Sequence, residues 1–130
     1  MGSREDAEQY IADMFAKRGF TLDLHRYMAV ADLEWSKKYG EFLDETYYKQ
    51  RTLDRKTKEL LQTVVEAALG ADVPHIQAHV RLALKHGATP QEVLEALECV
   101  VAPMGVLAFR RGVQAWAAEV GLEPVDPVQT

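Results

Sequence analysis

The sequence predicts an all-α protein, a single-domain bundle of about six helices over residues 1–130. Apolar residues recur at helical spacing in each long segment, and glycine or proline separates one segment from the next. No stretch shows the sustained alternation of apolar and polar residues that is typical of a half-buried strand. The 130 residues, 48% of them hydrophobic and 27% charged, match the size and composition of one folded domain.

The first two helices are predicted from a cap and from continued helical periodicity. Ser3 and Asp6 have the spacing of a capping box, and the apolar period that follows them runs to Gly19. After a short break, the same period continues over residues 24–47, which predicts a second helix with Gly40 as the candidate break within it.

The third and fourth helices have clear start and stop signals. Asp54 is a good N-cap for a helix over 55–69 that Gly70 ends. A fourth helix is predicted from about 73 to 86, with a proline in its first turn and Gly87 as its stop. The expected buried faces are Leu60, Leu61, Val64, Val65 and Ala68 in the third helix, and Ile76, Val80, Ala83 and Leu84 in the fourth.

The remaining chain predicts two further helices and a tail. Thr89 opens a capping box for a fifth helix that ends near Pro103. Gly105 restarts a helix that Gly121 closes, and the proline-containing segment 122–130 follows as a C-terminal tail.

Charge and cysteine content exclude several classes of function. Fifteen Lys and Arg against 20 Asp and Glu give a net charge of −5, which favours neither nucleic acid nor an anionic membrane as a partner. No apolar run reaches the roughly 20 residues of a transmembrane helix and the N-terminal segment is charged, so we expect a cytoplasmic protein. A single cysteine, Cys99, excludes an intrachain disulfide and a thiolate-rich zinc site. We expect Cys99 in the core, with no functional role. No phosphate-binding loop or other cofactor motif is present, so no cofactor is expected.

Several helices carry more apolar residues than one core-facing stripe requires. A small bundle with such an excess commonly buries part of it against copies of itself, so we expect a homo-oligomer.

Three of the four histidines lie on one face of the predicted helix over 73–86. On an ideal helix His79 lies about 40° and His86 about 20° around the axis from His75, at the edge of the buried face. Such an edge can line a cleft. The alternative for His75 and His79 is purely structural, with one side chain hydrogen-bonded in the core and the other in solvent. His75 and His79 also have the spacing of two metal ligands, and Asp72 lies one turn before them, but the helix lacks the general-base glutamate of a zincin.

Other polar residues have mainly structural interpretations. Glu59 and Glu66 lie on one line of the helix over 55–69, beside Gln62 and Thr63, and solvent is the expected surrounding for all four. Arg81 can bind a carboxylate ligand or form a surface ion pair.

The ordered run HVRLALKHGATPQEVLE, followed by the glycine of PMGVLAF, resembles the carboxymuconolactone decarboxylase family, within the superfamily of the alkyl hydroperoxidase D proteins. The resemblance covers about residues 53–113, which we take as the core of the domain. It implies a helical fold, assembly into a trimer or hexamer, and a lyase or decarboxylase of aromatic compound catabolism. The matching positions are His79, Val80, Arg81, Ala83, Gly87, Thr89, Glu92 and Gly105.

The departures from the family pattern narrow the expected activity. Peroxidase-type members carry a CxxC pair where this sequence has Asp72 and His75, so thiol peroxidase activity is not expected. Members that resemble the lactone decarboxylase itself usually have an aromatic residue and cysteine before the glycine and Ile-Pro-Ala-Ala after it. Here Pro103 and Met104 precede Gly105 and other apolar residues follow it, so we expect an altered substrate pocket.

The resemblance implies a lyase or decarboxylase that acts on a small lactone or carboxylic acid by proton transfer from histidine. His79 matches the family's histidine, His75 would share or tune its proton, and Glu59 would orient a histidine across the helix pair. Arg81 and Asp72 are the candidate substrate-binding residues, and this hypothesis assigns no metal. Two alternatives remain: a non-catalytic oligomer that binds a small ligand or a partner, and a metal-dependent enzyme that uses Asp72, His75 and His79.

Overall fold

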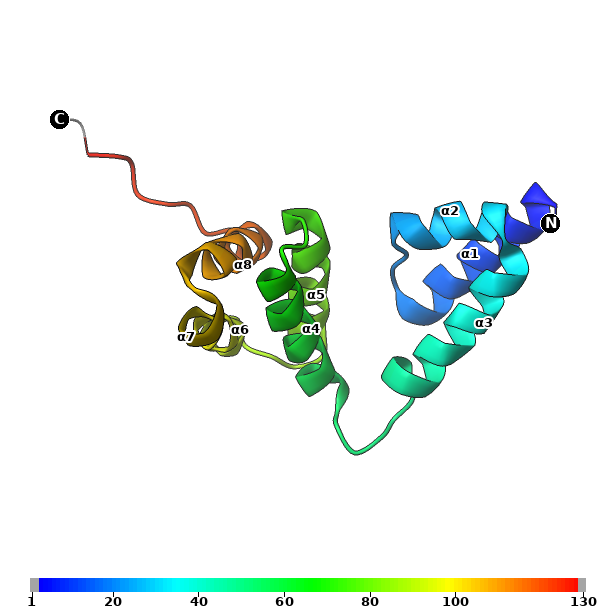
Figure 1. Ribbon diagram of the computed structural model, residues 1–130, viewed down its shortest axis with the longest axis horizontal. Helices are drawn as coiled ribbons and strands as arrows, with labels where there is room; N and C mark the ends of the chain where they lie inside the picture. The colour runs from blue at the N-terminus through cyan, green and yellow to red at the C-terminus, as the bar shows by residue number, and fades with distance from the viewer. Residues whose placement is uncertain (1–2, 129–130) are drawn as a thin grey trace. The chain divides into compact units, whose positions relative to one another are not determined.

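The computed structural model describes residues 3–128, and it confirms the all-α prediction: 76% of the chain is helical and the described residues form no strand. Within residues 3–128, seven helices have nine residues or more, against the expected six or so. Contacts divide the chain into two compact units, residues 1–49 and 50–130, each described here by itself (Figure 1). The single domain, its core over 53–113 and its tail over 122–130 stay predictions, and residues 122–128 form no regular element.

The first unit contains α1 (Arg4–Arg18), α2 (Asp23–Ala31), α3 (Leu33–Leu43) and a π-helical turn, η1 (Asp44–Tyr48). The capping box at Ser3 and the left-handed Gly19 confirm the predicted ends of the first helix. The predicted second helix breaks at Asp32 and not at Gly40. Asp32 leaves helical geometry and its carboxylate accepts from the Trp35 amide, which starts α3. Gly40 lies inside α3, where a side chain would collide with the Tyr10 hydroxyl.

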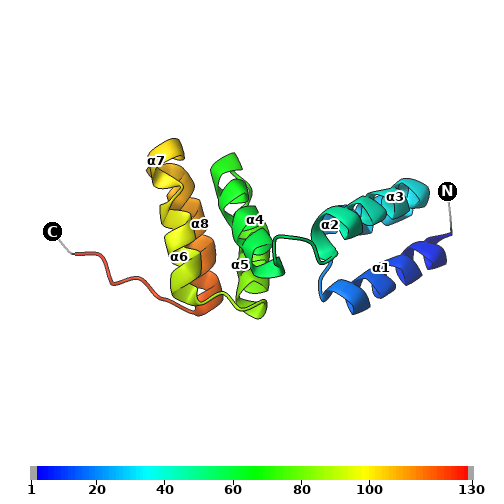
Figure 2. The same cartoon turned by 90° about the horizontal axis from the view of Figure 1, so that it is seen from below.

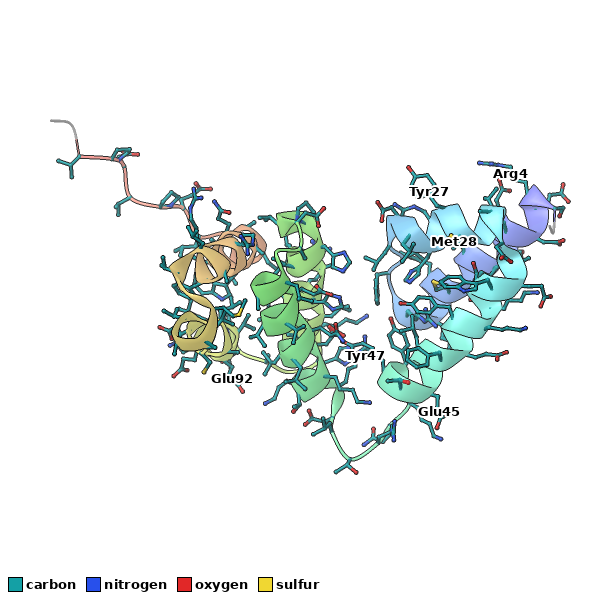
Figure 3. All side chains as sticks on the ribbon, in the orientation of Figure 1. Arg4, Tyr27, Met28, Glu45, Tyr47 and Glu92 are labelled. Carbon is teal, nitrogen blue, oxygen red and sulfur yellow. The ribbon has the colours of Figure 1, made fainter. Side chains whose placement is uncertain are left out.

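The second unit contains α4 (Arg55–Leu69), α5 (Val73–Lys85), α6 (Pro90–Glu98), the single turn α7 (Val101–Met104) and α8 (Val106–Val120). Helix α5 packs against both α4 and α8, and α6 packs against α8 (Figures 1 and 2). Asp54, Asp72 and Thr89 cap α4, α5 and α6 as predicted. Glu92, which is labelled in Figure 3, completes the Thr89 capping box and accepts from Lys56 of α4 at 3.1 Å.

The fifth helix ends earlier than predicted, at Glu98. Proline at 103 has no amide proton and its ring would clash with the carbonyl four residues earlier, at Cys99, so one continuous helix cannot pass this point. Cys99 is exposed, and the expectation that it lies in the core was wrong.

The core of the second unit confirms one predicted face and revises another. Ile76, Val80 and Ala83 of α5 are fully buried, as predicted. In α4, however, Leu61 and Val65 are 48% and 49% exposed, while Leu60 and Val64 are only partly buried. The buried core cluster consists of Ala67, Ile76, Val80, Ala83, Ala88, Val93, Leu97 and Ala115.

Among residues 3–128, no helix is both long enough and apolar enough to cross a membrane.

Candidate functional site

The face of α4 that packs toward α5 is polar. Glu59 and Thr63 are both 0% exposed, and they share with Ala67 the line of residues spaced four apart. The Thr63 hydroxyl donates to the backbone carbonyl of Glu59 at 2.8 Å, which satisfies one buried group. The expectation that Glu59 and Thr63 face solvent was therefore wrong, because this line of α4 faces its neighbour.

Glu59 lies between a cation on its own helix and a histidine on the next. Arg55 Nε donates to Glu59 Oε1 at 3.0 Å, one turn earlier on α4. His79 Nδ1 lies 2.9 Å from Glu59 Oε2, and because a carboxylate only accepts, the nitrogen donates. The family resemblance, unlike the helical pattern, implied such a contact, in which Glu59 orients a histidine across the helix pair.

With Nδ1 fixed by Glu59, the other ring nitrogen of His79 faces a second glutamate. His79 Nε2 lies 3.2 Å from Glu66 Oε1, and His75 Nε2 lies 3.1 Å from the same oxygen. The two imidazole rings are 5.6 Å apart, centroid to centroid. Two helices thus bring together a cluster of Glu59, Glu66, His75 and His79, with His75 at its most exposed side, 37% accessible against 9% for His79.

The cluster holds a proton on His79. Burial disfavours the charged imidazole, but hydrogen bonds to Glu59 and Glu66 and the charges of both carboxylates outweigh it and raise the pKa of His79 from 6.5 to about 9. At neutral pH the ring is an imidazolium between two carboxylates. It is therefore placed to give up a proton or to bind a negative group.

The other candidate residues lie outside the cluster. The Asp72 carboxylate accepts from the His75 amide as the N-cap of α5, so the carboxylate beside the two histidines is Glu66 and not Asp72. Arg81 binds Glu119 of α8 through two hydrogen bonds of 2.9 and 3.0 Å. His86 is exposed, with a pKa lowered by partial burial and by the charge of Arg55.

Sequence reasoning gave no functional role to Glu66 and Arg55. Both were detectable in principle, because Arg55 precedes Glu59 by one turn and Glu66 lies on the same helical line as Glu59. The short connection between α4 and α5 also makes them antiparallel neighbours. The sequence does not show how α4 is rotated about its axis, and that rotation decides whether this line faces α5 or solvent.

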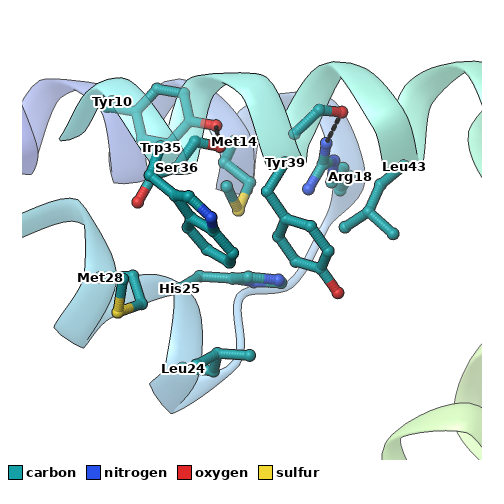
Figure 4. A pocket seen from close by; sticks show the side chains of 11 residues that line it. Tyr10, Met14, Arg18, Leu24, His25, Met28, Trp35, Ser36, Tyr39 and Leu43 are labelled. Atoms are coloured by element: carbon teal, nitrogen blue, oxygen red, sulfur yellow. Dashed lines mark hydrogen bonds between the residues drawn. The ribbon is translucent and has the colours of Figure 1, made fainter. Parts of the chain in front are cut away.

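The first unit contains a separate small cavity, shown in Figure 4. Arg18, His25, Trp35 and Tyr39 line it, and its volume of about 10 Å³ suits a single water molecule. It is too small for an organic substrate. The cluster between α4 and α5 is the candidate site because it gathers two histidines and two carboxylates within hydrogen-bond distance.

A comparison with known protein families places this chain in one of them. A family model described as the carboxymuconolactone decarboxylase family matches residues 34–118, which include every residue of the cluster and begin in α3. No curated protein and no solved structure matches the chain significantly.

Proposed function

Because the chain belongs to the carboxymuconolactone decarboxylase family, we propose that it is a lyase that acts on a small lactone or carboxylic acid by proton transfer from His79. The observation that carries the proposal is the position of His79, whose Nδ1 donates to buried Glu59 while its Nε2 faces Glu66 and His75. Such an arrangement fixes the ring and leaves one nitrogen for proton exchange.

The chemistry of decarboxylation matches what this cluster offers. When the bond to the carboxylate carbon breaks and CO₂ leaves, its electron pair moves into a conjugated carbonyl, and the resulting enolate must then accept a proton at carbon. A protonated His79 starts the cycle as an acid. Each turnover leaves that proton on the product carbon, so His79 must take up a replacement from solvent. His75 and His79 both contact Glu66 Oε1, so accessible His75 and Glu66 can relay a solvent proton to His79.

Substrate would approach from the side of His75, the most accessible member of the cluster. Arg81 would hold a substrate carboxylate only by exchanging it for Glu119, and Asp72 would have to leave its cap, so both substrate-binding assignments stay predictions. Assembly into a trimer or hexamer and a cytoplasmic location are part of the same proposal.

The test compares two histidines of α5 with the histidine at its C-cap. Small lactones and dicarboxylates that raise the melting temperature are taken forward to assays of CO₂ release. His79→Asn is expected to lower turnover by about a hundred- to ten-thousand-fold, which is typical for loss of an acid–base group. His75→Asn should cost less, and exposed His86→Asn is the matched control that should leave turnover unchanged.

Unchanged turnover in His79→Asn would refute the proposal, and so would unfolding or dissociation of that variant, because His79 would then be scaffold. Ligand binding without turnover in the wild type would instead support the non-catalytic binding protein.

A further inference from the structure

We propose that Glu66, His75 and His79 form a binding site for one divalent transition-metal cation of the zinc type. Each residue offers one ligand atom, and these atoms lie within 4.8 Å of one another. Glu66 Oε1 is 3.1 Å from His75 Nε2 and 3.2 Å from His79 Nε2. Two ligands bound to zinc at 2.0–2.1 Å with tetrahedral angles are about 3.3 Å apart, which matches the separation of each imidazole nitrogen from the carboxylate oxygen.

The ring of His79 is held in the orientation that a metal ligand requires. Histidine ligands usually donate their second ring nitrogen to a carboxylate, and that hydrogen bond turns the lone pair of the other nitrogen toward the ion. His79 donates Nδ1 to Glu59, which Arg55 binds from the other side. His75 and His79 lie one turn apart on α5, so both Nε2 atoms point to the same oxygen of α4.

A second observation comes from the other oxygen of Glu66. Glu66 Oε2 is buried and has no hydrogen-bond partner among the described residues. An unsatisfied buried acceptor is costly, and a cation coordinated by both carboxylate oxygens would satisfy it.

The donor set also selects the class of cation. Two imidazoles with one carboxylate suit zinc, cobalt, nickel or iron, whereas magnesium and calcium prefer sites made of oxygen atoms. Three protein ligands leave a coordination position open, and the accessible side of His75 lets a small molecule reach it.

This inference does not depend on the proposed function. Cation and proton compete for Nε2 of His79, so a bound metal would displace the proton and stand in its place as the positive group of the cluster. Binding can therefore be measured whether or not the chain turns over a substrate.

The experiment measures binding directly. Wild-type protein stripped with EDTA is titrated with Zn²⁺ by calorimetry and with Co²⁺ by visible absorption, which reports four-coordinate geometry. We expect one ion per chain. Glu66→Gln and His75→Ala should weaken binding by about a hundred-fold or more. Glu59→Gln removes an outer partner and should weaken it by about 10- to 100-fold.

Two matched controls lie outside the cluster: His86→Ala at the C-cap of α5 and Glu119→Gln on α8 should bind like the wild type. Circular dichroism checks that each variant folds, and if Glu66→Gln does not, the more accessible His75→Ala decides. Absence of stoichiometric binding in the wild type, or binding that survives both ligand substitutions, would overturn the inference. Metal binding without turnover would refute only the proposed lyase, and turnover without metal binding would refute only the metal site.

Discussion

Raising the pH of the metal-free protein from 6.5 to above 9 is expected to destabilise the fold through His79. The pKa of His79 rises from 6.5 to about 9 in the fold, so the folded state keeps a proton that the unfolded state loses. The stabilisation is therefore complete below about pH 6.5 and is lost as the pH rises through about 9. Glu59 and Glu66 are the charged groups that face the ring, and both lose a cationic partner when His79 gives up its proton. Arg55 stays bound to Glu59.

The expected size follows from the shift. At about 1.4 kcal/mol for each pKa unit, the change from 6.5 to about 9 corresponds to about 3 kcal/mol of the free energy of unfolding. Domains of this size are commonly stable by about 5–15 kcal/mol, so such a loss is large enough to measure.

The assay is urea unfolding followed by circular dichroism at several pH values between 6 and 10, in EDTA, on the wild type, His79→Gln and His86→Gln. The wild type and His86→Gln should lose stability together as the pH rises, whereas His79→Gln should show a flatter profile. Partial burial and the charge of Arg55 lower the pKa of His86 from its usual value, which moves its titration away from the range in which His79 titrates. Parallel profiles for the wild type and His79→Gln would refute the reasoning.

Four further outcomes are expected. Glu59→Gln should lower the free energy of unfolding by about 3–5 kcal/mol in urea, because the charged side chains of Arg55 and His79 lose their buried carboxylate partner. Glu119→Gln should lower the free energy of unfolding by less than about 1 kcal/mol in the same assay, because the Arg81 side chain is 62% exposed. Added salt should narrow the gap in stability between this variant and the wild type. Peroxide turnover with a dithiol donor should be absent, and turnover that Cys99→Ser abolishes would contradict this. Light scattering should return a mass above the 14.6 kDa of one chain, and a monomer at micromolar concentration would refute self-association.

Helix ends were predictable because their signals are local. The capping boxes at Ser3 and Thr89 and the glycine after α4 act within one turn, so the sequence contains all the information that they need. The break at Asp32 is also a cap, but the continuous apolar period on both sides concealed it, and the glycine at 40 looked like the better candidate. Position 40 is a glycine because the Tyr10 hydroxyl approaches it too closely for a side chain. That contact joins residues far apart in sequence, so no local pattern reveals it.

The candidate site was predictable only in part, because it depends on how one helix rotates against another. Periodicity identified which residues share a line of α4, and the family resemblance selected His79 and Glu59. Periodicity could not decide which line of α4 faces α5, since α4 carries apolar residues on more than one side. The structure leaves Leu61 and Val65 about half exposed and buries Glu59 instead.

That choice has an energetic cost, which bears on why the cluster is there. Two carboxylates beside α5 must be desolvated, and a well-packed apolar pair at such positions is often at least as stable as buried ions. Apolar side chains were available on the same helix, yet Leu61 and Val65 lie on its outer side. Ion pairs from Arg55 and His79 offset the cost for Glu59, whereas Glu66 keeps one buried oxygen without a hydrogen bond. A fold optimised for stability alone would not retain this arrangement, and perturbed titratable groups that gather with an accessible side are typical of functional sites. These features support the proposed functional site at Glu66, His75 and His79.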